Sequence, residues 1–185
     1  MNIIIVSGSP RPESLTRRVA LHLLDRLTGM PGISAHLVDL QDHPLSQAND
    51  VITNADQAPT VMRSLTIEIL KADAFVLVSP EYNGSYSPAM KMLLDHFPKQ
   101  RHKVFGIVTA SPGNLGGIRA AMQLQQLVYA LFGIGSPYML VVPGVETKFN
   151  TNNELTDDSL EPAIAQFLEE FLWLAERVTL IETAA

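Results

Sequence analysis

The stretch IIIVSGSPRPESLT, residues 3–16, decides the fold that this sequence predicts, because it joins a short apolar run to a polar loop. Residues 3–6 are β-branched and have the length of a strand. After Thr16, apolar side chains recur with helical spacing until Gly29, a residue type that commonly ends helices. The start of the chain therefore predicts a strand, a loop and an amphipathic helix, in that order.

The same alternation continues along the chain. Apolar runs of strand length occupy residues 3–6, 35–40, 75–78, 104–108 and 138–142. Helical spacing of apolar side chains predicts helices over residues 19–27, 61–69, 87–97, 118–131 and 158–178. Apolar strands separated by amphipathic helices are typical of a parallel sheet covered on both faces. The sequence therefore predicts an α/β fold, a doubly wound three-layer sandwich around a five-stranded parallel sheet.

Local signals refine the predicted helices. Ser87 is the expected N-cap of the third helix, with Pro88 at its first position, where a missing N–H does no harm. Asp158 and Glu161 are the expected capping pair of the last helix. The expected buried stripes include Val61 in the second helix and Met122 in the fourth.

Composition limits the possible functions. A chain of 185 residues favours a single domain over residues 1–185, and 46% apolar residues exclude a disordered chain. The net charge of −6 disfavours binding to nucleic acid or to an anionic membrane, so we expect a small-molecule partner. Without cysteine there is no disulfide or thiolate site. The first residues lack a basic leader and no apolar run could span a bilayer, so we expect a cytoplasmic protein.

The loop after the first strand has the chemistry of a phosphate site. In a doubly wound sheet, ligands lie outside the carboxyl ends of the strands. Ser9, Arg11, Ser14 and Thr16 offer hydroxyls and a guanidinium beside the N-terminus of a helix, which suits a phosphomonoester. The alternative is that the hydroxyls only cap the helix while Arg11 is solvated. The segment matches neither a Walker loop nor the three-glycine dinucleotide fingerprint.

Two further segments follow strands that end at the same edge. Residues 79–88, SPEYNGSYSP, contain two tyrosines that could cover a planar heterocycle, or they form an ordinary strand-to-helix turn. Residues 111–117, SPGNLGG, contain glycines that allow close approach to a ligand, or simply a tight turn. The polar segment 41–56 is long for a connection in a compact domain, and such loops are often functional.

These motifs together resemble the NAD(P)H-dependent FMN reductase family. The resemblance rests on GSPR at residues 8–11 through Thr16 and on PEYNG at residues 80–84, and it extends over nearly the whole chain. It implies a flavodoxin-like fold with strand order 2-1-3-4-5. It also implies three groups of FMN-binding residues. Those at the phosphate are Ser9, Arg11, Ser14, Leu15 and Thr16; those at the isoalloxazine are Pro80, Glu81, Tyr82, Asn83 and Gly84; those closing the other side are Ser111, Gly113, Gly116 and Gly117.

The resemblance further implies an oxidoreductase. Hydride would pass from NADPH or NADH to FMN, and then to a flavin, quinone or similar acceptor. We assign no catalytic residue, since the flavin supplies the chemistry, and no metal site, because the five histidines lack ligand spacing. The family likeness implies a homodimer or homotetramer. One departure is Thr16, where the family often has asparagine.

Two other functions stay open at this stage. The first is a flavodoxin-type electron carrier, although the first loop contains Arg11 and lacks the Thr/Ser-Gly-Thr pattern of such carriers. The second is an α/β interaction module without flavin, such as a receiver domain. A receiver domain needs an acidic cluster after the first strand, where this chain has serines, prolines and an arginine.

Overall fold

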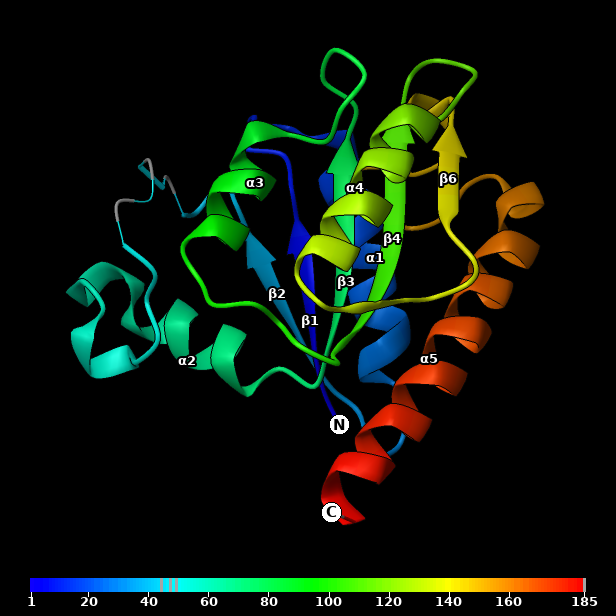
Figure 1. Cartoon of the computed structure of the whole chain (residues 1–185). Helices are drawn as coiled ribbons and strands as arrows, with labels where there is room; N and C mark the ends of the chain where they lie inside the picture. The colour runs from blue at the N-terminus through cyan, green and yellow to red at the C-terminus, as the bar shows by residue number, and fades with distance from the viewer. Residues whose placement is uncertain (44, 47, 49, 185) are drawn as a thin grey trace.

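A computed structural model describes residues 1–43, 45, 46, 48 and 50–184, with side chains described as far as residue 180. Its sheet is parallel, and the strand order β2-β1-β3-β4-β5 confirms the predicted flavodoxin-like topology (Figure 1). The strands are β1 (Asn2–Ser7), β2 (Ser34–Asp39), β3 (Ala74–Pro80), β4 (Val104–Ser111), β5 (Ile134–Gly135) and β6 (Leu140–Pro143).

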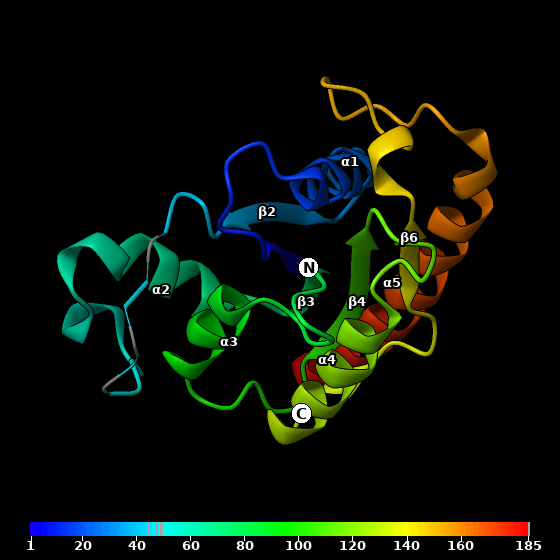
Figure 2. The ribbon, with the colours of Figure 1, turned by 90° about the horizontal axis from the view of Figure 1, so that it is seen from above.

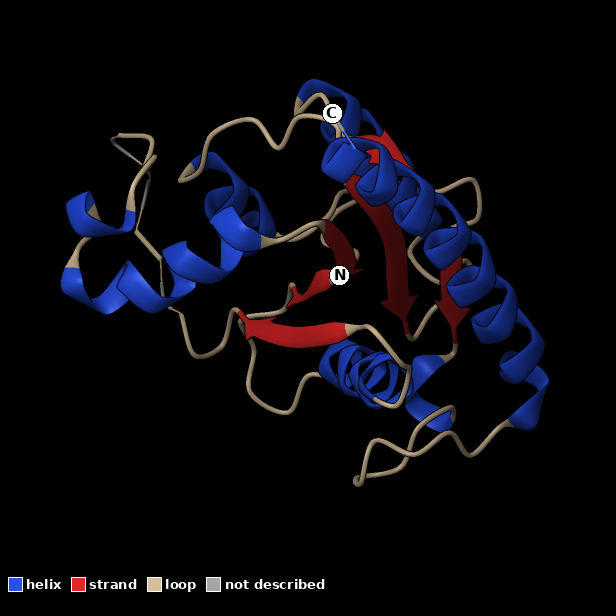
Figure 3. Cartoon of the chain, turned by 90° about the horizontal axis from the view of Figure 1, so that it is seen from below, coloured by secondary structure: helices blue, strands red, loops and turns tan. Residues whose placement is uncertain are grey.

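Helices cover both faces of the sheet and form the predicted three layers. The α-helices are α1 (Leu15–Thr28), α2 (Arg63–Lys71), α3 (Pro88–Asp95), α4 (Ile118–Ala130) and α5 (Glu161–Ala184). Short 3₁₀ helices are η1 (Ala55–Gln57), η2 (Thr60–Met62), η3 (Val145–Thr147) and η4 (Asp158–Leu160). One buried core joins the sheet to α1 and α5, and a second joins its other face to α2, α3 and α4 (Figures 1 and 3). Alternate residues of β1 therefore enter different cores, with Ile3 and Ile5 in the first and Ile4 and Val6 in the second.

The edge beyond β4 differs from the single strand predicted over residues 138–142. Two short strands occupy it: Ile134 pairs with Val104 in β5, and Leu140 pairs with Val108 in β6. Between them Ser136 still donates its N–H to the Phe105 carbonyl at 2.8 Å. The next residue is Pro137, which has no N–H to donate, and the chain leaves the ladder there before rejoining it.

Some of the predicted helix signals are confirmed and others are wrong. Ser87 is confirmed as the N-cap of α3, accepting the Met90 N–H at 3.1 Å, with Pro88 first in the helix. The predicted capping pair of α5 is wrong, because Asp157 accepts the Ser159 N–H and begins η4 instead. The predicted buried stripes are also wrong at two positions: Val61 is 84% exposed, in η2 before α2 begins, and Met122 is 47% exposed.

The long segment 41–56 has little regular structure in its described part before η1 begins. Ile52 donates its N–H to the His96 carbonyl at 2.7 Å, which attaches the segment to the end of α3. Residues 44, 47 and 49 lie outside the described residues. A function for this segment stays a prediction.

Candidate functional site

The carboxyl ends of β1, β3 and β4 surround a cavity of about 460 Å³. Figure 2 looks onto this edge of the sheet, where the loops that follow the strands converge. Ten of the fourteen predicted site residues line the cavity: Ser9, Arg11, Ser14, Leu15, Thr16, Pro80, Glu81, Tyr82, Asn83 and Ser111. The predicted site thus brings residues from three separate segments into one place.

The β1–α1 loop contributes hydroxyls and the N-terminus of α1. Ser14 is the N-cap, and its Oγ accepts the Arg17 N–H at 3.3 Å. Ser9 and Thr16 are buried, and Ser9 Oγ accepts the Arg11 N–H at 3.4 Å. The first turn of α1 contains no acidic residue. Hydroxyls and backbone N–H groups therefore face the cavity at the positive end of a helix.

The same loop is fixed against β3 by a close approach of backbones. Gly8 donates its N–H to the Val78 carbonyl at 2.8 Å, and Ser87 Oγ donates to the Gly8 carbonyl. A Cβ on Gly8 would lie 2.9 Å from the Val78 oxygen and 2.7 Å from Met90 Cε. A side chain does not fit at Gly8, so glycine at this position allows the β1–α1 loop to pack closely against β3.

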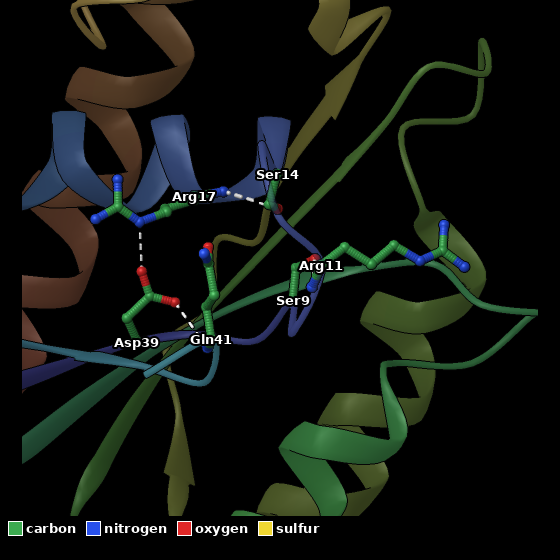
Figure 4. A network of polar contacts seen from close by, with 6 residues as sticks. All are labelled: Ser9, Arg11, Ser14, Arg17, Asp39 and Gln41. Atoms are coloured by element: carbon green, nitrogen blue, oxygen red, sulfur yellow. Dashed lines mark hydrogen bonds and ion pairs between the residues drawn. The ribbon is translucent and has the colours of Figure 1, made fainter. Parts of the chain in front are cut away.

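The Arg11 side chain points toward Tyr82 of the β3–α3 loop and away from Ser14. Its guanidinium carbon lies 4.4 Å from the centre of the Tyr82 ring, a cation–π contact. Figure 4 shows Arg11 on the loop and Arg17 on α1 pointing in opposite directions. Arg11 thereby links the β1–α1 loop to the β3–α3 loop.

The β3–α3 loop contains a tight turn at Asn83 and Gly84. Asn83 and Gly84 have φ angles of 52° and 82°, and Tyr82 and Ser85 exchange backbone hydrogen bonds of 2.8 and 3.1 Å. Positive φ at both central residues is the type I′ pattern, for which Asn-Gly is the preferred sequence. The Tyr82 hydroxyl is buried and has no hydrogen-bond partner among the described residues. Burial also raises the pKa of the Tyr86 phenol, in the same loop, above its ordinary value of 10.0.

Glu81 lines the cavity, yet its carboxylate is engaged with α4. Oε1 accepts the Arg119 Nε–H at 2.7 Å, and Oε2 accepts the Ala120 N–H at 3.4 Å. The Glu81 side chain is only 9% exposed, whereas Arg119 is 68% exposed. An acid near a helix N-terminus is favourably placed, so this contact fixes the β3–α3 loop relative to α4.

Four predicted glycines do not line the cavity: Gly84, Gly113, Gly116 and Gly117. Gly116 has a φ of 56°, and a Cβ there would lie 2.7 Å from the Pro143 nitrogen of β6. Gly117 has a φ of 89° and packs against Thr109. These two glycines shape the turn that carries the lining residue Ser111.

Sequence reasoning missed five lining residues: Pro12, Glu13, Ala110, Pro112 and Val145. The first four lie within or beside predicted segments, and their positions at strand ends could have identified them. Val145 lies in η3, shortly after β6 ends, and no sequence motif marked this position.

The chain is also similar in sequence to a known protein family, and this similarity agrees with the geometry of the site. Residues 1–148 match the model of the family described as NADPH-dependent FMN reductase. The chain belongs to this family. It is therefore an oxidoreductase that uses a reduced nicotinamide donor and FMN as its cofactor.

Curated relatives include two azoreductases. The chain is 26% identical to an NADPH azoreductase of Bacillus sp. (strain OY1-2), covering 92% of this chain and 90% of the relative. It is 31% identical to an FMN-dependent NADPH-azoreductase of Staphylococcus aureus, covering 74% of each chain. Among solved structures, FerB of Paracoccus denitrificans, a flavoenzyme NAD(P)H:(acceptor) oxidoreductase, has a TM-score of 0.77 at 23% identity. That match covers 95% of this chain and 97% of FerB, and supports the fold.

Two kinds of feature are absent from the described residues. No helix there is long and apolar enough to cross a membrane. No group of three or more histidine, aspartate or glutamate side chains is arranged to hold a metal ion in that part of the chain.

Proposed function

We propose that the cavity at the ends of β1, β3 and β4 binds FMN, with the phosphate at the β1–α1 loop and the isoalloxazine between Tyr82 and Pro112. The observation that carries this proposal is the lining of one cavity. Hydroxyl and guanidinium side chains come from the β1–α1 loop, which we call the polar end, whereas Tyr82 and apolar side chains come from β3, β4, β6 and the segments after them, which we call the aromatic end. A volume of about 460 Å³ lies within the range of roughly 300–1,000 Å³ typical of small-molecule sites.

The polar end fits a phosphomonoester. Ser9, Ser14 and Thr16 offer hydroxyls, and the N-terminus of α1 offers N–H groups with a partial positive charge. Leu15 stands among them as the first residue of α1. Arg11 can reach a phosphate from its position over Tyr82 by rotating its side chain, since it is exposed.

The aromatic end fits a planar heterocycle. Pro80, Tyr82, Ala110, Pro112 and Val145 line it with apolar surface. The unpaired Tyr82 hydroxyl is an exception to the rule that buried polar groups are hydrogen-bonded, and a polar edge of the ring would provide its partner. Asn83 and Ser111 add polar groups beside it.

Bound FMN would supply the redox chemistry, accepting hydride from the nicotinamide and passing electrons to the second substrate. The residues of the chain then bind and orient. The β1–α1 loop holds the phosphate, Tyr82 and Pro112 keep the ring between two loops, and the Glu81–Arg119 pair fixes the loop that carries Tyr82. No residue is assigned a proton-transfer role.

We propose that the acceptor is a planar conjugated molecule, such as an azo compound, a quinone or a free flavin. The names of two relatives favour azo compounds. Because the nicotinamide and the acceptor would use the same space against the flavin in turn, both must be planar. Competition between NADPH and each acceptor in steady-state kinetics would test this shared site.

We also propose that residues 1–185 form one domain, since both helical layers pack on the same sheet. A homodimer or homotetramer is supported by exposed Leu115, Met122 and Tyr129, which recur every seven residues along α4 and the turn before it. Light scattering would show a mass above that of the 20.3 kDa chain. A cytoplasmic location would give the enzyme its reduced nicotinamide donor.

The test of the function is a visible spectrum of the purified protein, followed by titration with FMN, FAD and riboflavin. Stopped-flow mixing with NADPH and NADH then measures reduction of the bound flavin. A protein that binds no flavin would contradict the site. A flavin that is bound, yet reduced only through a partner protein, would favour the electron-carrier alternative.

A further inference from the structure

A second cavity, of about 600 Å³, adjoins the proposed FMN pocket on the other side of the β1–α1 loop. The two cavities share Glu13 and Ser14 as a common wall. The remaining residues around the second cavity are Arg17, Arg18, Gln41, Asp42, Thr151 and Asn153. A ligand that extends from the first pocket past Ser14 would enter this space.

Two consecutive arginines stand where α1 alone would not favour them. Arg17 and Arg18 follow closely on Leu15, the first residue of the helix, and no acid accompanies them in the first turn. The positive end of the helix dipole disfavours cations at this position, whereas Arg26 in the last turn is favourably placed. A local choice that opposes helix stability points to a functional requirement for positive charge.

Both guanidinium groups are held in place by the protein. Arg17 Nε donates to Asp39, a buried carboxylate at the end of β2 (Figure 4). Arg18 Nη1 donates to the Phe149 carbonyl at 3.1 Å. Within the described part of the chain, the other guanidinium nitrogens of these two residues donate no hydrogen bond. Each of these two arginines therefore has guanidinium N–H groups left to donate to a ligand beside the cavity.

The positive charge beside the cavity is only partly offset: Arg17 pairs with buried Asp39, whereas Arg18 forms no ion pair among the described residues. Glu13 and Asp42 are exposed, where water and salt screen them, whereas both arginines are half-buried. Asp39 fixes Arg17 and does not line the cavity. Gln41, Thr151 and Asn153 are neutral groups that suit ribose hydroxyls. The lining therefore matches a phosphorylated ribose.

We propose that this second cavity binds the 2′-phosphate end of NADPH, and that Arg17 and Arg18 select NADPH over NADH. The proposal rests on the proposed function, because it assumes that the nicotinamide end reaches flavin in the first pocket. Arg11 points away from this cavity and is proposed to serve the first phosphate site, so Arg17 and Arg18 are left to bind a separate anion (Figure 4). NADPH differs from NADH only by that phosphate.

The direct test is calorimetric binding of adenosine 2′,5′-bisphosphate and 5′-AMP to FMN-loaded protein, which needs no turnover. The wild type should bind the bisphosphate at least tenfold more tightly than AMP. Arg18→Gln should reduce this preference to less than threefold. Arg63→Gln removes one exposed positive charge from α2, away from both cavities, and should leave the preference unchanged. Equal binding of the two nucleotides by the wild type would overturn the proposal.

A second variant protects the result against misfolding. Removing Arg17 would leave buried Asp39 without its partner, so Arg17→Lys is used, which keeps the charge and loses the planar donor pair. It should lower the ratio of KM for NADH to KM for NADPH about fivefold or more. If FMN binds and is reduced equally well by both donors in the wild type, the selectivity proposal fails while the proposed function stands. If Arg18→Gln weakens FAD binding but not the bisphosphate, the cavity holds a flavin adenylate instead, and the proposal is also overturned.

Discussion

Glu81 and Arg119 form a salt bridge that joins the loop after β3 to the first turn of α4. The carboxylate also accepts the Ala120 N–H, so both of its oxygens are used by the protein. A side chain held in this way positions the adjoining Tyr82–Asn83 turn at the cavity. It is poorly prepared to deliver a proton to a substrate.

The first prediction is that Glu81→Gln preserves hydride transfer to bound flavin within about tenfold, equivalent to roughly 1.4 kcal/mol of barrier. The amide oxygen can still accept from Arg119, so the loop stays in place. Single-turnover reduction at saturating FMN measures this step without interference from lost cofactor. Arg119→Gln breaks the same pair from its exposed side and should give a loss of similar size. A thousandfold loss in Glu81→Gln alone, with flavin still bound, would make Glu81 a participant in the reaction.

The second prediction concerns Arg11 and the flavin phosphate. Arg11→Ala should weaken FMN by about 1.5 to 3 kcal/mol if the guanidinium pairs with the phosphate in a shielded position. Riboflavin, which lacks the phosphate, should be affected far less. Isothermal titration with both flavins separates the two contributions. An equal loss for both would indicate that Arg11 acts only by stacking on Tyr82.

Much of the site could be predicted because it follows from topology. Parallel strands end at one edge, so the segments after β1, β3 and β4 must meet there. The type I′ turn at Asn83 and Gly84 was not predicted, although that dipeptide is the preferred pair for such a turn. What could not be read was the direction of side chains within those loops. Glu81 turns to α4, and Arg11 turns to Tyr82, because of contacts between segments far apart in the sequence.

The errors in the predicted helices have a physical origin. The α4 sequence carries two competing apolar faces, one with Met122 and one with Leu124. The face with Ala120, Ala121 and Leu124 is buried, leaving Met122 exposed. Small side chains allow a helix to approach the sheet closely, a requirement that periodicity alone does not express. The divided edge strand was missed for another reason: the predicted run 138–142 begins after Pro137, and the two residues of β5 before it are too few to show a strand pattern.

The third prediction compares two glycines of one turn. A Cβ on Gly116 would lie 2.6 Å from Val141 Cγ1 and 2.9 Å from the Val142 carbonyl carbon, at a φ of 56°. Gly116→Ala should therefore destabilise the protein by about 2 kcal/mol or more. On Gly113 the nearest atom would be Ser111 Oγ at 3.6 Å, so Gly113→Ala should be neutral or slightly stabilising. Thermal unfolding should show a fall of roughly 4 °C or more for the first variant only. Equal midpoints would contradict the close packing of Gly116 on β6.

The fourth prediction uses the unpaired hydroxyl of Tyr82. In protein without flavin, Tyr82→Phe should not lower the free energy of unfolding, because the buried hydroxyl has no partner among the described residues. With flavin bound, the same change should weaken FMN by about 0.5 to 1.5 kcal/mol, the net contribution of one hydrogen bond. Denaturant unfolding and flavin titration are the two measurements. Unchanged FMN affinity would mean that the hydroxyl does not meet the ring.

The last prediction concerns His22, on α1 away from the proposed flavin pocket. Burial lowers the pKa of its imidazole below the ordinary value of 6.5, and Arg26 lowers it further. Its Nε2 is buried without a hydrogen-bond partner among the described residues, and the ring contacts Phe149 with centroids 5.4 Å apart. The folded protein therefore favours the neutral form more than the unfolded chain does.

The sign of the pH effect follows from linkage. As pH falls below about 6.5, unfolded His22 takes up a proton before folded His22 does, so the free energy of unfolding decreases with falling pH. His22→Phe keeps a ring against Phe149 and should remove this part of the decrease between pH 7 and pH 5. The control is His102→Asn, which removes an exposed histidine at a φ of 62°, a conformation that asparagine tolerates. Urea unfolding at several pH values gives the slope of the free energy of unfolding against pH for each variant. If the slope in His22→Phe equals that of the wild type, the lost stability at low pH arises elsewhere, and the neutral state of His22 does not contribute to it.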